Sequence, residues 1–177
     1  MKLYRAKIPT IAHECIKRLL DDGDIEVPHE KRPDAEQDLA AIMEDFLRRD
    51  MALREAIKDH MATNSIPYDQ FGRTKGRLAD EWGHPTGEDV ERFLVRQFVE
   101  NLMISPNVDE VYEDDRALYK KLMEVVRGHD VDEEEIREEA RGRIKNVREG
   151  TVEYEIAMQE AVREVKRRRG LYASRER

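Results

Sequence analysis

Apolar residues recur three and four positions apart along most of this 177-residue chain. At that spacing they line one face of an α-helix, so the pattern predicts amphipathic helices. Turn and capping residues divide the pattern into eight predicted helices, which start at Leu3, Pro33, Asp50, Ser65, Thr86, Val111, Asp132 and Thr151. Pro33 is typical of a first helical turn, and Asp132 with Glu135 forms a capping box. We therefore predict an all-α protein, with a short extended stretch near Ile25.

The second half of the chain repeats the order of the first half. Similar residues recur 80 to 87 positions apart: Met43 and Met123, Asp50 and Asp130, Ile66 and Val152, Gly83 and Gly170. A few insertions and deletions in the loops account for the drift of this offset. We predict two tandem units of about four helices each, residues 1–85 and 86–177. They are expected to pack together or to be joined rigidly through the helix at residues 86–103.

The composition of the chain bears on the stability of these units and on the partners that they can bind. Charged residues make up 41% of the chain, hydrophobic residues 39% and aromatic residues 6%. The apolar stripes are therefore narrow, and a unit of about 85 residues should be weakly stable unless mutual packing or a dimer interface adds burial. The formal net charge is −8, and neither half is basic. That balance disfavours a module that grips nucleic-acid phosphates over a broad face.

Two sequence features resemble a known family. The first is Asp22-Gly23-Asp24-Ile25-Glu26-Val27, and the second is Glu149-Gly150-Thr151 followed by a basic run and Gly170-Leu171. With these features both halves resemble one bacterial family, catalogued as "domain of unknown function 507", as two tandem copies. The first copy departs from the second at its end, where it has Gly72 and Gly76 and no basic run. The resemblance implies a helical fold and a bacterial source, and it implies no reaction, ligand or catalytic residue.

Candidate catalytic and metal-binding residues are few. Cys15, the only cysteine, lies on an apolar stripe, which favours a buried inert thiol over a reactive one. No two histidines are three or four residues apart, so no helix offers a two-histidine metal site. The acidic run at residues 133–139 resembles a solvated face with helical ion pairs such as Glu139 with Arg143. Since we find no carboxylate on an apolar stripe, where burial would raise its pKa, we predict no catalytic residue, cofactor or metal.

The clearest local feature is a run of four cations near the C-terminus: Lys166, Arg167, Arg168 and Arg169. Cations in the last turn of a helix stabilise its dipole, which is a purely structural interpretation. The same run could instead bind an acidic patch on a protein partner, or the phosphates of a nucleic acid.

These observations favour a non-enzymatic helical protein that acts as a scaffold or regulator through a protein partner, with a homodimer as a further option. The alternative is a nucleic-acid-associated protein that uses the C-terminal basic run. An enzyme whose site is assembled across helices is the third class. No segment has the roughly 18 to 20 apolar residues that span a bilayer, and residues 1–10 do not resemble a signal peptide. We therefore expect a cytoplasmic location and no membrane partner.

Overall fold

The structure is a computed structural model that describes residues 1–145 and 147–172. Its elements are the helices and strands α1 (Ile8–Asp21), β1 (Ile25–Glu26), α2 (Arg32–Thr63), α3 (Phe71–Glu81), α4 (Asp89–Ile104), β2 (Glu110–Val111), α5 (Asp115–Gly128), α6 (Glu133–Arg141) and α7 (Val152–Arg168). Short 3-10 turns precede α1, α2 and α3. The predicted all-α fold is confirmed, because the described strands are a single two-residue pair.

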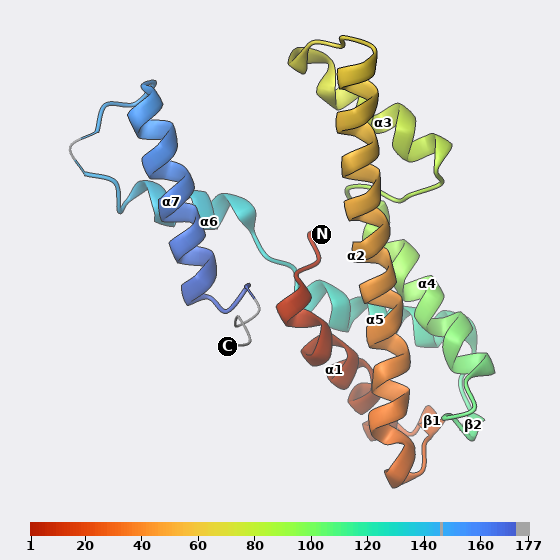
Figure 1. Ribbon diagram of the computed structural model, residues 1–177. Helices are drawn as coiled ribbons and strands as arrows, with labels where there is room; N and C mark the ends of the chain where they lie inside the picture. The colour runs from red at the N-terminus through yellow and green to blue at the C-terminus, as the bar shows by residue number, and fades with distance from the viewer. Residues whose placement is uncertain (146, 173–177) are drawn as a thin grey trace.

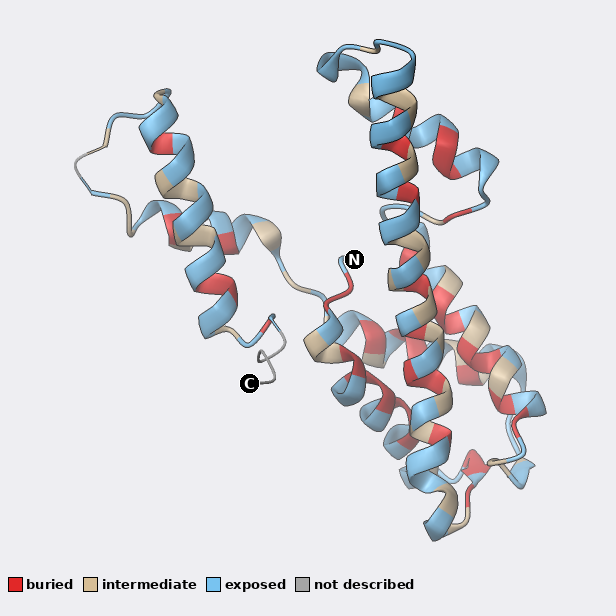
Figure 2. Ribbon diagram, viewed as in Figure 1, coloured by how far each residue is buried: buried red, intermediate tan, exposed pale blue. Residues whose placement is uncertain are grey.

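The main hydrophobic core lies where α1, the first half of α2, α4 and α5 meet (Figures 1 and 2). Its largest fully buried side chains include Ile16, Leu39, Phe98 and Leu118, one from each of these helices. Each helix contributes one apolar stripe, so four stripes together exclude water where one stripe could not. This core draws on residues from both sides of position 85.

Two arms extend from this central body (Figure 1). One is the hairpin of α6 and α7, whose small core around Ile136 and Val165 also includes Tyr4 of the N-terminal segment. The other is the α2–α3 arm, in which the second half of α2 packs on α3 through Leu53, Ile57 and Leu78. Figure 2 shows both arms mostly exposed, with only a few buried positions in each.

A short antiparallel pairing joins the two halves of the body. Ile25 of β1 pairs with Val111 of β2, and Glu26 pairs with Glu110. The side chain of Lys121 on α5 reinforces this end of the molecule by binding the buried carboxylate of Asp24, at 2.6 Å.

The predicted helix start at Asp50 is wrong, because α2 runs through it as one helix of 32 residues. Asp50 does not cap a helix, and its carboxylate pairs instead with Arg54 one turn later, at 2.8 Å. The sequence offers no glycine or proline between residues 34 and 66 that would stop the helix. Aspartate is a residue type that can cap a helix, but the buried side chains of Leu53 and Ile57 favour an unbroken helix.

Of the other predicted helix starts, some are confirmed and others are wrong. The side chain of Asp132 caps α6 and that of Thr151 caps α7, as predicted. Thr86 does not cap α4, which begins at Asp89. Val111 does not start α5, because it pairs in β2 and the Asp114 side chain caps the helix instead.

Two predicted inward-facing segments also differ in the structure. Leu78 and Trp82 are four residues apart, which predicts that both lie on one apolar face, yet Trp82 is 42% exposed at the C-terminal end of α3. The spacing of Ile136, Ala140 and Ile144 predicts one helix through residue 144, yet α6 ends at Arg141. Gly142 directly after it is poorly suited to prolong a helix. Among the described residues no helix is long and apolar enough to cross a bilayer.

Candidate functional site

The predicted partner-binding run begins at Lys166, which lies against the acidic face of α6. Its ammonium group is 2.7 Å from the carboxylate of Glu133 and 5.5 Å from the centre of the Tyr4 ring. The Tyr4 hydroxyl donates a hydrogen bond to the same carboxylate. Only 7% of Lys166 is exposed, so it joins the N-terminal segment to the hairpin and is not presented to solvent.

The two arginines at the end of the run also bind acidic side chains of α6. Arg169 donates to Glu139 at 2.8 Å and to Glu135 at 3.2 Å, and Arg168 pairs with Glu139. The hydrogen bonds that Arg169 donates to the Glu135 and Glu139 carboxylates raise the pKa of Arg169. The hydrogen bond from Arg169, with the nearby charge of Arg168, lowers the pKa of Glu139.

Three of the four cations therefore serve to hold α7 on α6. Arg167 is exposed and forms no ion pair with any residue that the structure describes. The acidic run was predicted to be a solvated face with pairs along one helix, and Glu139 does pair with Arg143 at 3.4 Å. Sequence reasoning missed the pairs across the hairpin, because they join residues about 30 positions apart.

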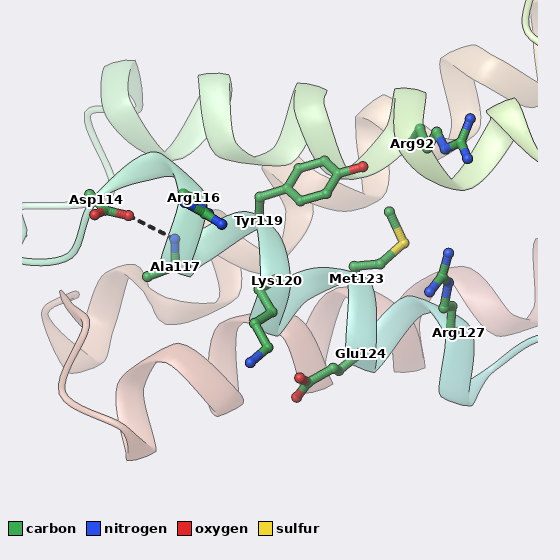
Figure 3. A pocket seen from close by; sticks show the side chains of 9 residues that line it. All are labelled: Arg92, Asp114, Arg116, Ala117, Tyr119, Lys120, Met123, Glu124 and Arg127. Carbon is green, nitrogen blue, oxygen red and sulfur yellow. Dashed lines mark hydrogen bonds between the residues drawn. The ribbon is translucent and has the colours of Figure 1, made fainter.

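A second basic region, which the sequence analysis did not single out, lies in a groove between α4 and α5 (Figure 3). The groove has a volume of about 740 Å³, and it is lined by Arg92, Asp114, Arg116, Ala117, Tyr119, Lys120, Met123, Glu124 and Arg127. Arg92 lies on α4. The other eight lining residues lie on α5 or directly before it. Four of the nine are cations, on a chain whose net charge is −8.

Four side chains of the groove converge on the side that faces α4 (Figure 3). The ring of Tyr119 points toward Arg92, and Met123 and Arg127 turn to the same side, whereas Lys120 and Glu124 point away. Residues 116, 119, 120, 123 and 127 share this part of α5 because positions three and four apart are neighbours on a helix. The arrangement places two guanidinium groups and a phenol around one thioether.

The arginines of the groove are only partly engaged by the protein. Arg127 donates through Nε to Glu91, at 3.0 Å, and Arg92 pairs with Asp89, at 3.2 Å. A guanidinium has five N–H donors, so these bonds fix the orientation of each group and leave further donors for a ligand. Both side chains are more than half exposed. Chemically, the groove can bind an anionic group that lies beside an apolar one.

Two carboxylates are buried against cations that come from other elements. Asp24 pairs with Lys121, and Glu91, whose side chain is 12% exposed, pairs with Arg127 of the groove. Each cation is distant in the sequence, so no local pattern indicated the pair. Burial raises the pKa of the Cys15 thiol to about 12, in agreement with the predicted buried, inert thiol.

Two of the histidines bind carboxylates of neighbouring helices. His13 lies 2.9 Å from Glu36, and His129 lies 2.7 Å from Glu14. Within residues 1–145 and 147–172, no group of three or more His, Cys, Asp and Glu side chains is placed to hold a metal ion.

The fold and the groove thus define an all-helical protein with a mixed-charge surface groove. The chain belongs to the family described as "Protein of unknown function (DUF507)", whose model matches residues 1–171. The family resemblance expected from the sequence is confirmed, whereas the presence of two copies stays a prediction. None of the curated proteins compared with the chain matches it.

Proposed function

We propose that this chain is a non-enzymatic scaffold or regulator that acts by binding another protein. The observation that supports this most is an uncovered apolar pair on α7. Val152 is 73% exposed and Ile156 is 54% exposed, and their spacing places them side by side on the helix. A chain with 41% charged residues has little need to expose such a pair unless a partner covers it.

The position of the pair suits a binding role. Within the part of the chain that the structure describes, α6 is the one helix on which α7 packs extensively, and α6 has only nine residues. The first two turns of α7 therefore have one covered face, which contains Tyr154, and one open face. The hairpin extends away from the central body (Figure 1), so a partner can approach this face without contacting the main core.

Affinity capture with the full chain tests the proposal. The chain is immobilised and exposed to a nuclease-treated extract of its source cell, beside the double variant Val152→Ser, Ile156→Ser. A second double variant, Gln159→Ser with Glu160→Ser, is the control, because both residues are exposed on the same helix. We expect a defined protein that the control retains and the apolar double variant loses. Equal capture by all three chains would contradict the proposal.

The nucleic-acid alternative has a separate test in the basic run. Phosphate binding through these cations would fall steeply with salt, but Lys166, Arg168 and Arg169 already bind carboxylates of α6. We expect the triple variant Arg167→Ala, Arg168→Ala, Arg169→Ala to leave any RNA or DNA binding of the full chain unchanged. A loss of salt-dependent RNA binding in this variant would instead establish the alternative.

We also propose that the two halves are copies of one unit, related by an approximate two-fold axis. The order helix, strand, helix, helix begins at α1 and begins again at α4. α1 packs on α2 and α5, while α4 packs on α5 and α2. At an offset of 85, residue 110 is the counterpart of residue 25, and residue 111 is the counterpart of residue 26. Residue 25 then pairs with the counterpart of residue 26, and residue 26 pairs with the counterpart of residue 25. Such reciprocal pairing is the mark of a two-fold interface.

A crystal structure would test the duplication directly. We expect α1 with β1 to superpose on α4 with β2 after a rotation near 180°. A rotation far from that value, or a superposition that requires a different order of elements, would contradict it.

A further inference from the structure

We propose that the groove between α4 and α5 binds an acidic, amphipathic segment of a partner protein. This inference rests on the proposed function and adds the class of partner and a second contact surface. The groove and the apolar pair on α7 lie on different elements, so binding at each surface can be tested, and contradicted, separately.

Charge complementarity supports an acidic ligand. Arg92, Arg116, Lys120 and Arg127 line the groove beside the carboxylates Asp114 and Glu124. Asp89 and Glu91 pair with Arg92 and Arg127, whereas Arg116 and Lys120 form no ion pair within the part of the chain that the structure describes. The unpaired positive charge of the groove therefore lies on Arg116 and Lys120, and the spare N–H donors of Arg92 and Arg127 add to it.

The apolar surface between the cations favours a protein segment. The ring of Tyr119 points toward Arg92, and Met123, which is 7% exposed, lies beneath the two arginines Arg92 and Arg127 (Figure 3). A peptide with alternating acidic and apolar side chains could place a carboxylate on the guanidinium groups and an apolar side chain on the half-buried ring of Tyr119. Arginine binds carboxylates through paired N–H donors.

The same surface is poorly arranged for a nucleic-acid strand. A phosphate backbone requires a continuous track of cations. Here Asp89 pairs with Arg92, Glu91 pairs with Arg127, and Glu124 lines the groove itself. These carboxylates would repel successive phosphates, whereas a peptide can place its neutral residues beside them.

Fluorescence anisotropy with the full chain tests the inference. The probe is a labelled 16-residue helical peptide of glutamate and leucine, with leucine at every third or fourth position. A peptide with lysine in place of glutamate and a 16-nucleotide single-stranded RNA serve as comparison probes. We expect saturable binding of the acidic peptide and no saturable binding of the other two.

Two charge-matched variants locate the binding. Arg92→Glu with Arg116→Glu reverses two exposed groove cations, and Arg48→Glu with Arg73→Glu reverses two exposed cations outside the groove. Both variants leave Arg127 and the buried Glu91 intact, and their circular dichroism spectra should match that of the parent chain. We expect the groove variant to raise the Kd at least about tenfold, the scale of lost close charge contacts, and the control to change it less than about twofold.

Three results would overturn the inference: no binding of the acidic peptide to the parent chain, equal weakening by both variants, or binding of RNA that the groove variant abolishes. The first two would leave the capture through α7 untouched. Equal capture by the parent chain and by the Val152→Ser, Ile156→Ser variant, with peptide binding intact, would instead contradict the wider proposal.

Discussion

At the scale of single residues, His84 is the least satisfied buried polar side chain among the described residues. It is 5% exposed, its ring stacks on Phe46 with centroids 4.9 Å apart, and neither ring nitrogen has a hydrogen-bond partner. Asp50 lies 3.4 Å from Nε2, too poorly aligned for a hydrogen bond. Burial lowers the pKa of His84, and it outweighs the opposing effect of the Asp50 carboxylate.

This environment predicts a loss of stability in mild acid. Because the pKa of His84 is lowered in the folded chain, the unfolded chain binds a proton first as the pH falls through about 6.5, the ordinary value. The free energy of unfolding then decreases with falling pH. We expect urea unfolding between pH 7.5 and 5.5 to show a larger loss of stability for the parent chain than for His84→Phe, which keeps the ring stack. Parallel curves for the two proteins would show that His84 does not titrate in this way.

At the scale of helices and strands, the sequence predicted the type of element better than its limits. The caps at Asp132 and Thr151 could be identified because a capping side chain acts on the next two or three residues. The continuity of α2 through Asp50 could not be identified from the sequence, since it depends on the packing of Leu53 and Ile57 against α3. The ion pairs between α6 and α7 were hidden for the same reason, because Glu133 and Lys166 meet only when the hairpin folds.

The α6–α7 hairpin should behave as a local unit of stability. Its small core of five described buried residues, which include Tyr4 of the N-terminal segment and Leu171, contrasts with the twenty-four of the main core. Truncating the fully buried Ile136 to alanine should cost about 2–5 kcal/mol, and most of that loss should appear in the hairpin. In hydrogen exchange with mass spectrometry, we expect Ile136→Ala to lose protection in residues 133–168 and to retain it in α1 and α4.

Leu118→Ala is the matched comparison, because Leu118 is fully buried in the main core. That change should lower protection throughout the central helices. If Ile136→Ala lowered protection equally in every helix, the hairpin would be part of one cooperative unit with the body.

At the scale of the whole molecule, the predicted need for mutual packing agrees with the observed core. Ten of the twenty-four buried residues of the main core lie between Val90 and Val126, and the others lie between Leu3 and Phe46. Neither set can be buried without the other, so division of the chain at residue 85 would expose both. The groove between α4 and α5 could not be predicted, because Arg92 and Arg127 are brought together only by this packing.

Removal of the second half should therefore strongly destabilise the first. We expect residues 1–85 alone to melt well below the full chain in circular dichroism, or to show no cooperative transition, since α1 and α2 would lose their contacts with α4 and α5. Equal melting temperatures would show that the first half has a sufficient core by itself.

The central claim, that the chain works by binding a protein, is tested most directly by site-specific photo-cross-linking in the source cell. A photoreactive phenylalanine analogue replaces the exposed Ile156 on α7 in one chain and the exposed Lys58 on α2 in another. We predict a discrete protein adduct from position 156 that is absent from position 58 and resists nuclease. Identical adduct patterns from the two positions, or an adduct from position 156 that nuclease removes, would contradict the claim.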